Sequence, residues 1–159
     1  MKIIIADSST LITLLDTKNF ALLFELFEEI IITNEVYLEI TQKFDHKEEI
    51  KKYIVNEKIT IERLPHQDIY EMLIKRLDKG EAESISLAKI KKLPLIIDEK
   101  KGRKIAKSLN IPIIGLIGII LKSIEKEIIT KERAINIIQE IEDNHFRISK
   151  ALRRLVYEY

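Results

Sequence analysis

The sequence predicts a three-layer α/β/α fold around a mostly parallel β-sheet. One observation is a set of short, wholly apolar segments rich in isoleucine, such as residues 2–6 (KIIIA), which are typical of strands covered on both faces. A second is that helix-length segments separate these strands, an alternation typical of parallel α/β sheets. A third is the absence of repeats and of a Pro/Gly-rich linker, so we expect a single domain over residues 1–159.

Each predicted strand is a short run dominated by isoleucine or leucine. Most are apolar on both faces, whereas residues 59–64 alternate apolar and polar residues, as a half-buried strand does. In chain order, the predicted strands are residues 2–6, 30–33, 59–64, 95–97 and 112–114.

Helices are predicted where a capping residue precedes apolar residues at helical spacing. Ser8, Ser9 and Thr10 offer a cap for the first helix and Asn34 for the third, while Asp78 and Glu81 have the spacing of a capping box. The predicted helices are residues 8–16, 20–28, 34–44, 45–56, 67–77, 81–91, 100–109, 115–125, 130–142 and 148–157.

Composition excludes several classes of protein. The chain has no cysteine, which rules out disulfides, thiolate nucleophiles and cysteine-ligated zinc or iron–sulfur sites. Its 27 basic and 26 acidic residues give a net charge of +1, so charge alone demands no polyanionic partner. The apolar run at residues 111–121 is shorter than the ~20 residues of a membrane span, and the N-terminus has no secretory signal. We therefore expect a soluble, cytoplasmic protein without a membrane partner.

Four carboxylates are predicted to meet at one edge of the sheet. Asp7 and Asp98 directly follow predicted strands, Glu81 begins a helix, and Glu39 lies in the helix after residues 30–33. Carboxyl ends of parallel strands and N-termini of the packed helices share an edge, which is where such folds bind ligands. Clustered carboxylates repel one another unless a cation lies among them, and an oxygen-only ligand set favours Mg²⁺ or Mn²⁺. Such a site supports metal-assisted phosphodiester hydrolysis.

Each of these acids also has a purely structural interpretation. Asp7 and Asp98 could cap the helices that follow them. Glu81 could complete the capping box with Asp78, and Glu39 could be a solvated helical glutamate. Pattern alone leaves both interpretations open.

Several segments together resemble a PIN domain of a prokaryotic subgroup of unknown function. The segments that carry this resemblance are residues 3–10 (IIIADSST), 34–40 (NEVYLEI), 80–88 (GEAESISLA), 95–99 (LIIDE), 102–103 (GR), 115–118 (GLIG) and 146–149 (FRIS). They span nearly the whole chain. The resemblance implies a Mg²⁺- or Mn²⁺-dependent ribonuclease of the VapC toxin type, with a parallel sheet flanked by helices.

The resemblance also implies roles for individual residues. The catalytic and metal-binding acids would be Asp7, Glu39, Glu81 and Asp98, and the hydroxyl of the first helix would be Ser8 or Ser9. Two departures from the commonest pattern are Glu81, where Asp is frequent, and Ile96, which replaces a threonine that would contribute a minor hydroxyl near the metal.

Two basic stretches could contact a polyanion. Arg103, Lys104 and Lys107 share one face of the predicted helix after Asp98, where they could hold an RNA phosphate. A solvated basic helix is the alternative. The second stretch, residues 147–154, could contact RNA, dock an acidic antitoxin segment or form plain surface.

The predicted function is therefore metal-dependent endoribonuclease, as the toxin of a toxin–antitoxin pair, with RNA as substrate, a separate antitoxin as partner and a homodimer as assembly. The alternative is a non-catalytic RNA- or protein-binding module with a PIN-like fold. A haloacid-type phosphatase is disfavoured because Ser9 stands where a second aspartate is expected after Asp7. A receiver domain is disfavoured because no acid pair precedes the phosphoacceptor strand.

Overall fold

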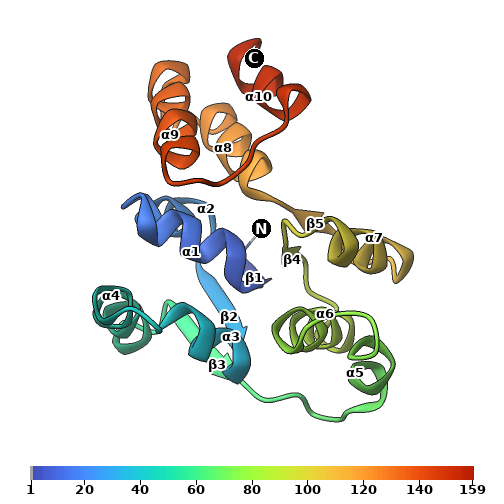
Figure 1. Cartoon of the computed structure of the whole chain (residues 1–159). Coiled ribbons are helices and arrows are strands. Elements are labelled where there is room, and N and C mark those ends of the chain that lie inside the picture. The colour runs from blue at the N-terminus through green and yellow to red at the C-terminus, as the bar shows by residue number, and fades with distance from the viewer. Residues whose placement is uncertain (1) are drawn as a thin grey trace.

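A five-stranded, all-parallel β-sheet forms the centre of the protein (Figure 1). The computed structural model describes residues 2–159. The strands are β1 (Ile3–Ala6), β2 (Glu29–Thr33), β3 (Ile59–Glu62), β4 (Leu95–Ile96) and β5 (Ile113–Ile114). Every predicted strand is present and every pairing is parallel, which confirms the predicted α/β fold class.

The strand order β3-β2-β1-β4-β5 places a topological switch point beside β1. From β1 the chain continues to β2 and β3 on one side, and then to β4 and β5 on the other. Ala6 pairs with Ile96, and the Asp7 backbone N–H bonds to the Ile96 carbonyl at 2.9 Å. Asp7 therefore lies at the carboxyl edge between β1 and β4, where open α/β sheets form ligand crevices.

Helices connect the strands and cover both faces of the sheet (Figure 1). They are α1 (Ser8–Asp16), α2 (Leu23–Leu26), α3 (Asn34–Ile40), α4 (Phe44–Val55), α5 (Asp68–Leu73), α6 (Lys79–Lys91), α7 (Lys100–Ser108), α8 (Leu116–Glu125), α9 (Lys131–Asp143) and α10 (Lys150–Tyr157), with a 3₁₀ turn, η1 (Phe20–Leu22).

Alternating strand residues build two hydrophobic cores, one on each face of the sheet. On β1, Ile4 and Ala6 face the core formed with α1–α4 and α8–α10, whereas Ile5 faces the core formed with α5–α7. Strand β2 divides in the same way, with Ile30 and Ile32 opposite to Ile31. Because all of these side chains are buried, the strands read as continuous apolar runs. The result is the expected three-layer arrangement.

Three predicted helices are shorter than expected. The segment predicted over residues 34–44 ends at Ile40, because the Thr41 hydroxyl bonds to the Tyr37 carbonyl and the Gln42 amide to the Leu38 carbonyl. These side chains satisfy carbonyls at the helix end and let the chain turn into α4. The segments predicted over residues 67–77 and 20–28 end at Leu73 and Leu26, the latter after starting as η1.

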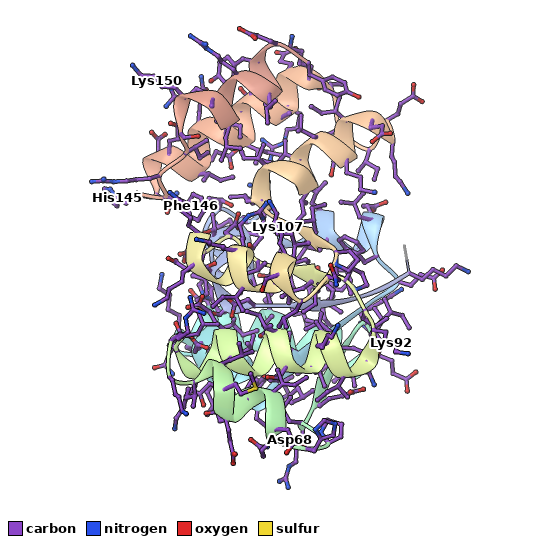
Figure 2. All side chains as sticks on the ribbon, turned by 90° about the vertical axis from the view of Figure 1, so that its right-hand side faces the viewer. Asp68, Lys92, Lys107, His145, Phe146 and Lys150 are labelled. Carbon is purple, nitrogen blue, oxygen red and sulfur yellow. The ribbon has the colours of Figure 1, made fainter. Side chains whose placement is uncertain are left out.

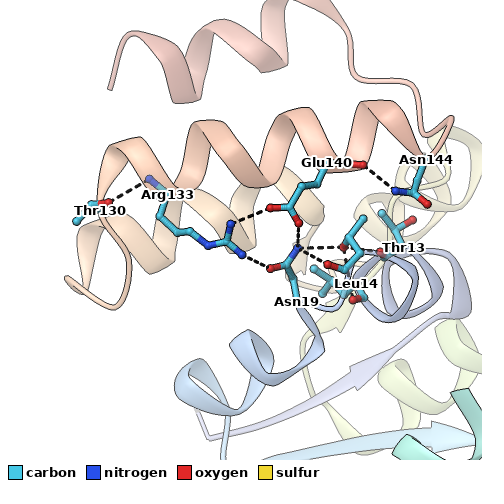
Figure 3. A network of polar contacts seen from close by, with 8 residues as sticks. Thr13, Leu14, Asn19, Thr130, Arg133, Glu140 and Asn144 are labelled. Atoms are coloured by element: carbon cyan, nitrogen blue, oxygen red, sulfur yellow. Dashed lines mark hydrogen bonds and ion pairs between the residues drawn. The ribbon is translucent and has the colours of Figure 1, made fainter. Parts of the chain in front are cut away.

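A polar network joins α9 to Asn19, in the segment after α1 (Figure 3). Arg133 donates to Asn19 Oδ1 at 2.9 Å and pairs with Glu140 at 2.8 Å, and Asn19 donates to Glu140 at 3.4 Å. Most of the apolar side chains of α8, including Leu116 and Ile120, are buried inside the same chain. Among residues 2–159, no helix has both the length and the apolar character needed to cross a membrane.

Candidate active site

The four predicted acids come from four different elements at or near the carboxyl edge of the sheet. Asp7 follows β1, Glu39 lies near the end of α3, Glu81 is in the first turn of α6, and Asp98 lies just beyond β4. Asp7 and Glu81 are 3% and 8% exposed, whereas Glu39 and Asp98 are half-buried. Buried carboxylates need compensation, so the neighbours of each one decide what the site can do.

Burial outweighs the compensation that Asp7, Glu39 and Glu81 receive, so the pKa of each carboxyl lies above its usual value. Burial raises the pKa of Asp7 to about 7, and the charges of Glu39, Asp78 and Asp98 add to the rise, while the Ser8 backbone N–H opposes it. Burial also raises the pKa of Glu39, and the charge of Asp78 adds to this.

Glu81 shows the same effect of burial. Burial raises its pKa to about 8, with further contributions from the adjoining Asp78 carboxyl and from the charge of Asp7. Mutual influence among Asp7, Glu39, Glu81 and Asp78 means that these side chains form one electrostatic cluster. A cluster of this kind takes up protons or binds a cation.

Three carboxylate oxygens in the cluster are buried without a hydrogen-bond partner among the described residues. They are Asp7 Oδ1, Glu39 Oε1 and Glu81 Oε2. An unpaired buried carboxylate oxygen is energetically unfavourable, and oxygen-only donors suit a hard divalent cation. By the chemistry of their donors, these residues fit Mg²⁺ or Mn²⁺.

Asp98 is held differently. Its Oδ2 accepts a hydrogen bond from the Thr10 hydroxyl and its Oδ1 accepts one from the Leu116 backbone N–H at 3.0 Å. Asp98 thus caps α8, whereas α7, the helix considered as its structural alternative, has no side-chain cap. In the part of the chain from residue 2 onward, no three acidic or histidine side chains converge closely enough to be a ready metal site. Binding of a cation would therefore require the carboxylates to move toward one another.

Helix capping, the structural alternative for Asp7 and Glu81, explains where their backbones lie but not why their carboxylates are buried. Asp7 occupies the N-cap position of α1, yet its side chain makes no capping bond there. At α6 the cap is Asp78, whose Oδ1 accepts from the Glu81 backbone N–H at 2.9 Å. A full capping box would also have the Glu81 carboxylate accept from the Asp78 backbone N–H, a bond that this cap does not include. One Glu81 oxygen stays unpaired.

Hydroxyls at the start of α1 reach two of the acids. Ser8 donates to Glu39 Oε2 at 3.2 Å, whereas the buried Ser9 hydroxyl has no partner among residues 2–159. Thr10, which was predicted only as a capping residue, contacts Asp98. Sequence reasoning missed this role because three adjacent hydroxyl residues are equivalent until the position of α1 against β4 is known.

The basic residues differ in their relation to the acidic edge. Arg103 is half-buried and donates to the Ile97 carbonyl at 2.7 Å, directly before Asp98. Lys104 and Lys107 are exposed on α7, which lies across the front of Figure 2.

The second basic stretch lies on and before α10. Arg153 pairs with Glu142 of α9, and Lys150 is exposed at the start of α10, above α7 in Figure 2. This pairing ties one of the basic side chains to the protein itself.

A cavity of about 360 Å³ lies next to Asp98. Its polar end is formed by Asp98 and Arg103, and its apolar wall by residues of β5, α8 and α10. Leu152 and Leu155 of α10 line it and remain 43% and 51% exposed. The acidic edge therefore opens onto an apolar surface.

Comparisons with known proteins agree on the kind of fold. The profile of the PIN-domain family DUF3368 matches residues 3–158. A PilT N-terminus domain protein from the hyperthermophilic archaeon Sulfolobus solfataricus is similar in structure, with a TM-score of 0.50 and 18% sequence identity. The match covers 79% of this chain and 95% of that protein, and at this identity it shows a shared fold alone. None of the curated proteins compared by sequence matches the chain.

Proposed function

The chain belongs to the PIN-domain family, and from that premise we propose that it is a metal-dependent endoribonuclease that hydrolyses RNA phosphodiester bonds. PIN domains are in general nucleases. The observation that carries the proposal is the set of buried carboxylates of Asp7, Glu39 and Glu81, each with an oxygen that lacks a partner. A non-catalytic binding module would have no need for such uncompensated acids.

Asp7, Glu39, Glu81 and Asp98 are the residues that would hold Mg²⁺ or Mn²⁺. When bound there, a divalent cation would supply Lewis acidity, which would favour ionisation of a water and stabilise negative charge on the phosphate. Asp7 and Glu81 must lose their protons first, since their pKa values of about 7 and 8 leave them partly protonated at neutral pH. Thr10 and the Leu116 N–H orient the Asp98 carboxylate, and each of its oxygens keeps a lone pair with which it could contact a cation.

Residues beside the acids would bind the substrate. Arg103 uses one N–H group on the Ile97 carbonyl, and a guanidinium has further donors for a phosphate oxygen. Lys104 and Lys107 would hold neighbouring phosphates, because exposed lysines neutralise the RNA backbone without reading its sequence. The unpaired Ser9 hydroxyl is the donor we assign to the substrate, whereas Ser8 orients Glu39.

We further propose that the enzyme is a toxin restrained by a separate antitoxin in the cytoplasm. A supporting feature is the cavity beside Asp98, where an apolar side chain of a partner could bind next to that acid. The basic residues of α7 and α10 favour an acidic segment in that partner.

A homodimer remains part of the proposal, although α8 gives it no support because its apolar face is buried in one chain. Sedimentation of the purified protein as a monomer would contradict it.

The nuclease activity is tested by incubating end-labelled RNA with the protein in Mg²⁺, in Mn²⁺ or in EDTA. We expect cleavage that depends on the cation and disappears in Asp7→Asn and Asp98→Asn. Asp68→Asn, a change of the same kind at an exposed residue of α5, should cleave like the wild type. Full activity in an Asp7→Asn, Asp98→Asn double variant would refute the proposal. RNA binding without cleavage in any cation, unaffected by these substitutions, would favour the non-catalytic alternative.

A further inference from the structure

Three of the four glycines in the chain leave room for a carboxylate of the candidate site. A Cβ atom on Gly80 would overlap Glu39 Oε1, one on Gly102 would lie 2.7 Å from Glu81 Oε2, and one on Gly115 would lie 2.6 Å from Asp98 Oδ1. All three spacings are shorter than a real Cβ atom tolerates. The glycines thus allow an approach that alanine would block.

Backbone conformation does not explain these glycines. Across residues 2–159, no glycine has a positive φ, so an alanine could adopt the same backbone. Gly80 and Gly102 lie in the first turns of α6 and α7, where alanine is the better helix former. What glycine provides at these positions is the space taken by the carboxylates and, at Gly102, equally by the buried Ile97 side chain.

The space also has an electrostatic consequence. Gly80, Gly102 and Gly115 lie at the N-terminal ends of α6, α7 and α8, where free backbone N–H groups and the helix dipole attract negative charge. The oxygens beside Gly80 and Gly102 are the same Glu39 and Glu81 oxygens that have no hydrogen-bond partner. These two oxygens therefore lie close to the helix N-termini without accepting a hydrogen bond from a described residue.

We propose that Gly80 and Gly102 are positioning residues for the divalent cation of the carboxylate site, an inference that rests on the proposed function. By leaving out a methyl group, they let Glu39 and Glu81 lie at the N-termini of α6 and α7, each with an unpaired oxygen, and from these positions the two carboxylates would converge on the cation. Gly115 likewise leaves room for Asp98, but the Asp98 oxygen there accepts a hydrogen bond from the Leu116 N–H.

Alanine at either position should separate cation affinity from folding. The atom displaced by a new methyl group at residue 80 is the end of the flexible Glu39 side chain, which can rotate toward solvent. At residue 102 the Glu81 carboxylate gives way, together with the Ile97 side chain. The fold should therefore remain while the carboxylate leaves its position.

Gly118 is the matched control for these substitutions. It also lies in the first turn of a helix, α8, and a Cβ there would lie 2.7 Å from a side-chain carbon, but that carbon belongs to Ile114. Gly118→Ala therefore imposes a similar crowding without moving an acid.

The test is calorimetric titration of Mn²⁺ into the wild type, Gly80→Ala, Gly102→Ala and Gly118→Ala, with the melting temperature of each measured in EDTA. We expect Gly80→Ala and Gly102→Ala to bind Mn²⁺ at least tenfold more weakly while melting in EDTA no more than a few degrees below the wild type. Gly118→Ala should bind Mn²⁺ like the wild type.

Wild-type Mn²⁺ affinity in Gly80→Ala and Gly102→Ala would overturn this inference and leave the proposed nuclease standing. Weaker binding together with a large loss of melting temperature would also overturn it, because alanine would then disrupt the fold. If the wild type itself binds no divalent cation, the metal-dependent function fails and this inference fails with it.

Discussion

The Thr10 hydroxyl donates a hydrogen bond to Asp98 although the two residues are 88 positions apart in the sequence. The bond joins the first turn of α1 to the segment after β4, across the switch point of the sheet. The other Asp98 oxygen accepts from the Leu116 N–H of α8. Two helices from opposite ends of the chain therefore orient one acid.

Thr10→Val should lower both stability and activity. The valine keeps the shape of the buried threonine but removes the donor, and a hydrogen bond to a charged group contributes about 1.5–3 kcal/mol. We expect the free energy of unfolding to fall by about that amount in chemical denaturation. RNA cleavage should fall at least tenfold because Asp98 loses its orientation.

The matched control is Thr13→Val on the same helix. Thr13 is also buried, but its hydroxyl bonds to the Ser9 carbonyl inside α1 and not to an acid. This change should reduce stability by about 1 kcal/mol and leave cleavage intact. Equal loss of cleavage in Thr10→Val and Thr13→Val would mean that the Thr10–Asp98 bond has no particular role.

Stability of the metal-free protein should fall as the pH rises from about 5 to 8.5. Because the pKa of Asp7 rises from 3.8 to about 7 and that of Glu81 from 4.5 to about 8, the folded protein keeps protons that the unfolded chain has released. Their contribution to stability is complete below about pH 4 and disappears as the pH passes the folded-state values. Each such proton changes the free energy of unfolding by up to about 1.4 kcal/mol per pH unit.

The measurement is the melting temperature in EDTA across this pH range, with Asp7→Asn and Asp143→Asn beside the wild type. Asp7→Asn removes one of the two groups and should flatten the pH dependence, whereas Asp143→Asn, at an exposed residue of α9, should preserve it. Mn²⁺ should restore stability most at the alkaline end, because it binds the deprotonated acids. A metal-free melting temperature that rises with pH would show that the acids are not proton-loaded in the folded state.

The features that could be predicted from the sequence are those set by local residue patterns, namely the strands and the acids that follow them. Isoleucine-rich runs marked all five strands, and the position of Asp7 and Asp98 just after strands predicted their edge of the sheet. The order of the strands was not predictable, because each buried run is equally apolar and none specifies its neighbour. The end of α3 at Ile40 was missed because it depends on how the Thr41 and Gln42 side chains fold back.

The details of the site depend on long-range contacts that no local pattern records. Asp98 was predicted to meet the other acids, yet Thr10 and Leu116 take up both of its oxygens. Gly80 directly precedes one predicted helix and Gly115 begins another, but only the folded structure brings a carboxylate against each of them. Patterns of residue types thus selected the acids of the candidate site, and packing decides their geometry.

The network around Asn19 should determine how firmly α9 is attached (Figure 3). Asn19 is 7% exposed and bonds to Arg133, Glu140 and the Thr17 carbonyl. Asn19→Ala leaves Arg133 and Glu140 with fewer partners, so we expect unfolding to become easier by about 1–3 kcal/mol.

Asn144→Ala is the control for the Asn19 substitution, since the exposed Asn144 follows directly after α9 and bonds to the Glu140 carbonyl. It should change the stability by less than about 1 kcal/mol in the same denaturation experiment. Similar losses in Asn19→Ala and Asn144→Ala would mean that the network does not anchor α9.

The basic face of α7 should contact the RNA backbone. If Lys104 and Lys107 each neutralise an RNA phosphate, each substitution by glutamine should weaken RNA binding and reduce its dependence on salt. For single-stranded RNA, the slope of log affinity against log salt should become shallower by about 0.7 for each lost contact.

The measurement is fluorescence anisotropy with a labelled RNA oligonucleotide in EDTA, where no cleavage is expected, at several salt concentrations. Lys51→Gln removes the same charge from an exposed position on α4, on the side of the protein away from α7 in Figure 1, and should leave the slope unchanged. Equal slopes for Lys104→Gln, Lys107→Gln and Lys51→Gln would mean that the α7 lysines only solvate the surface. In that case a general loss of positive charge, and not the loss of a particular phosphate contact on α7, would account for the weaker binding.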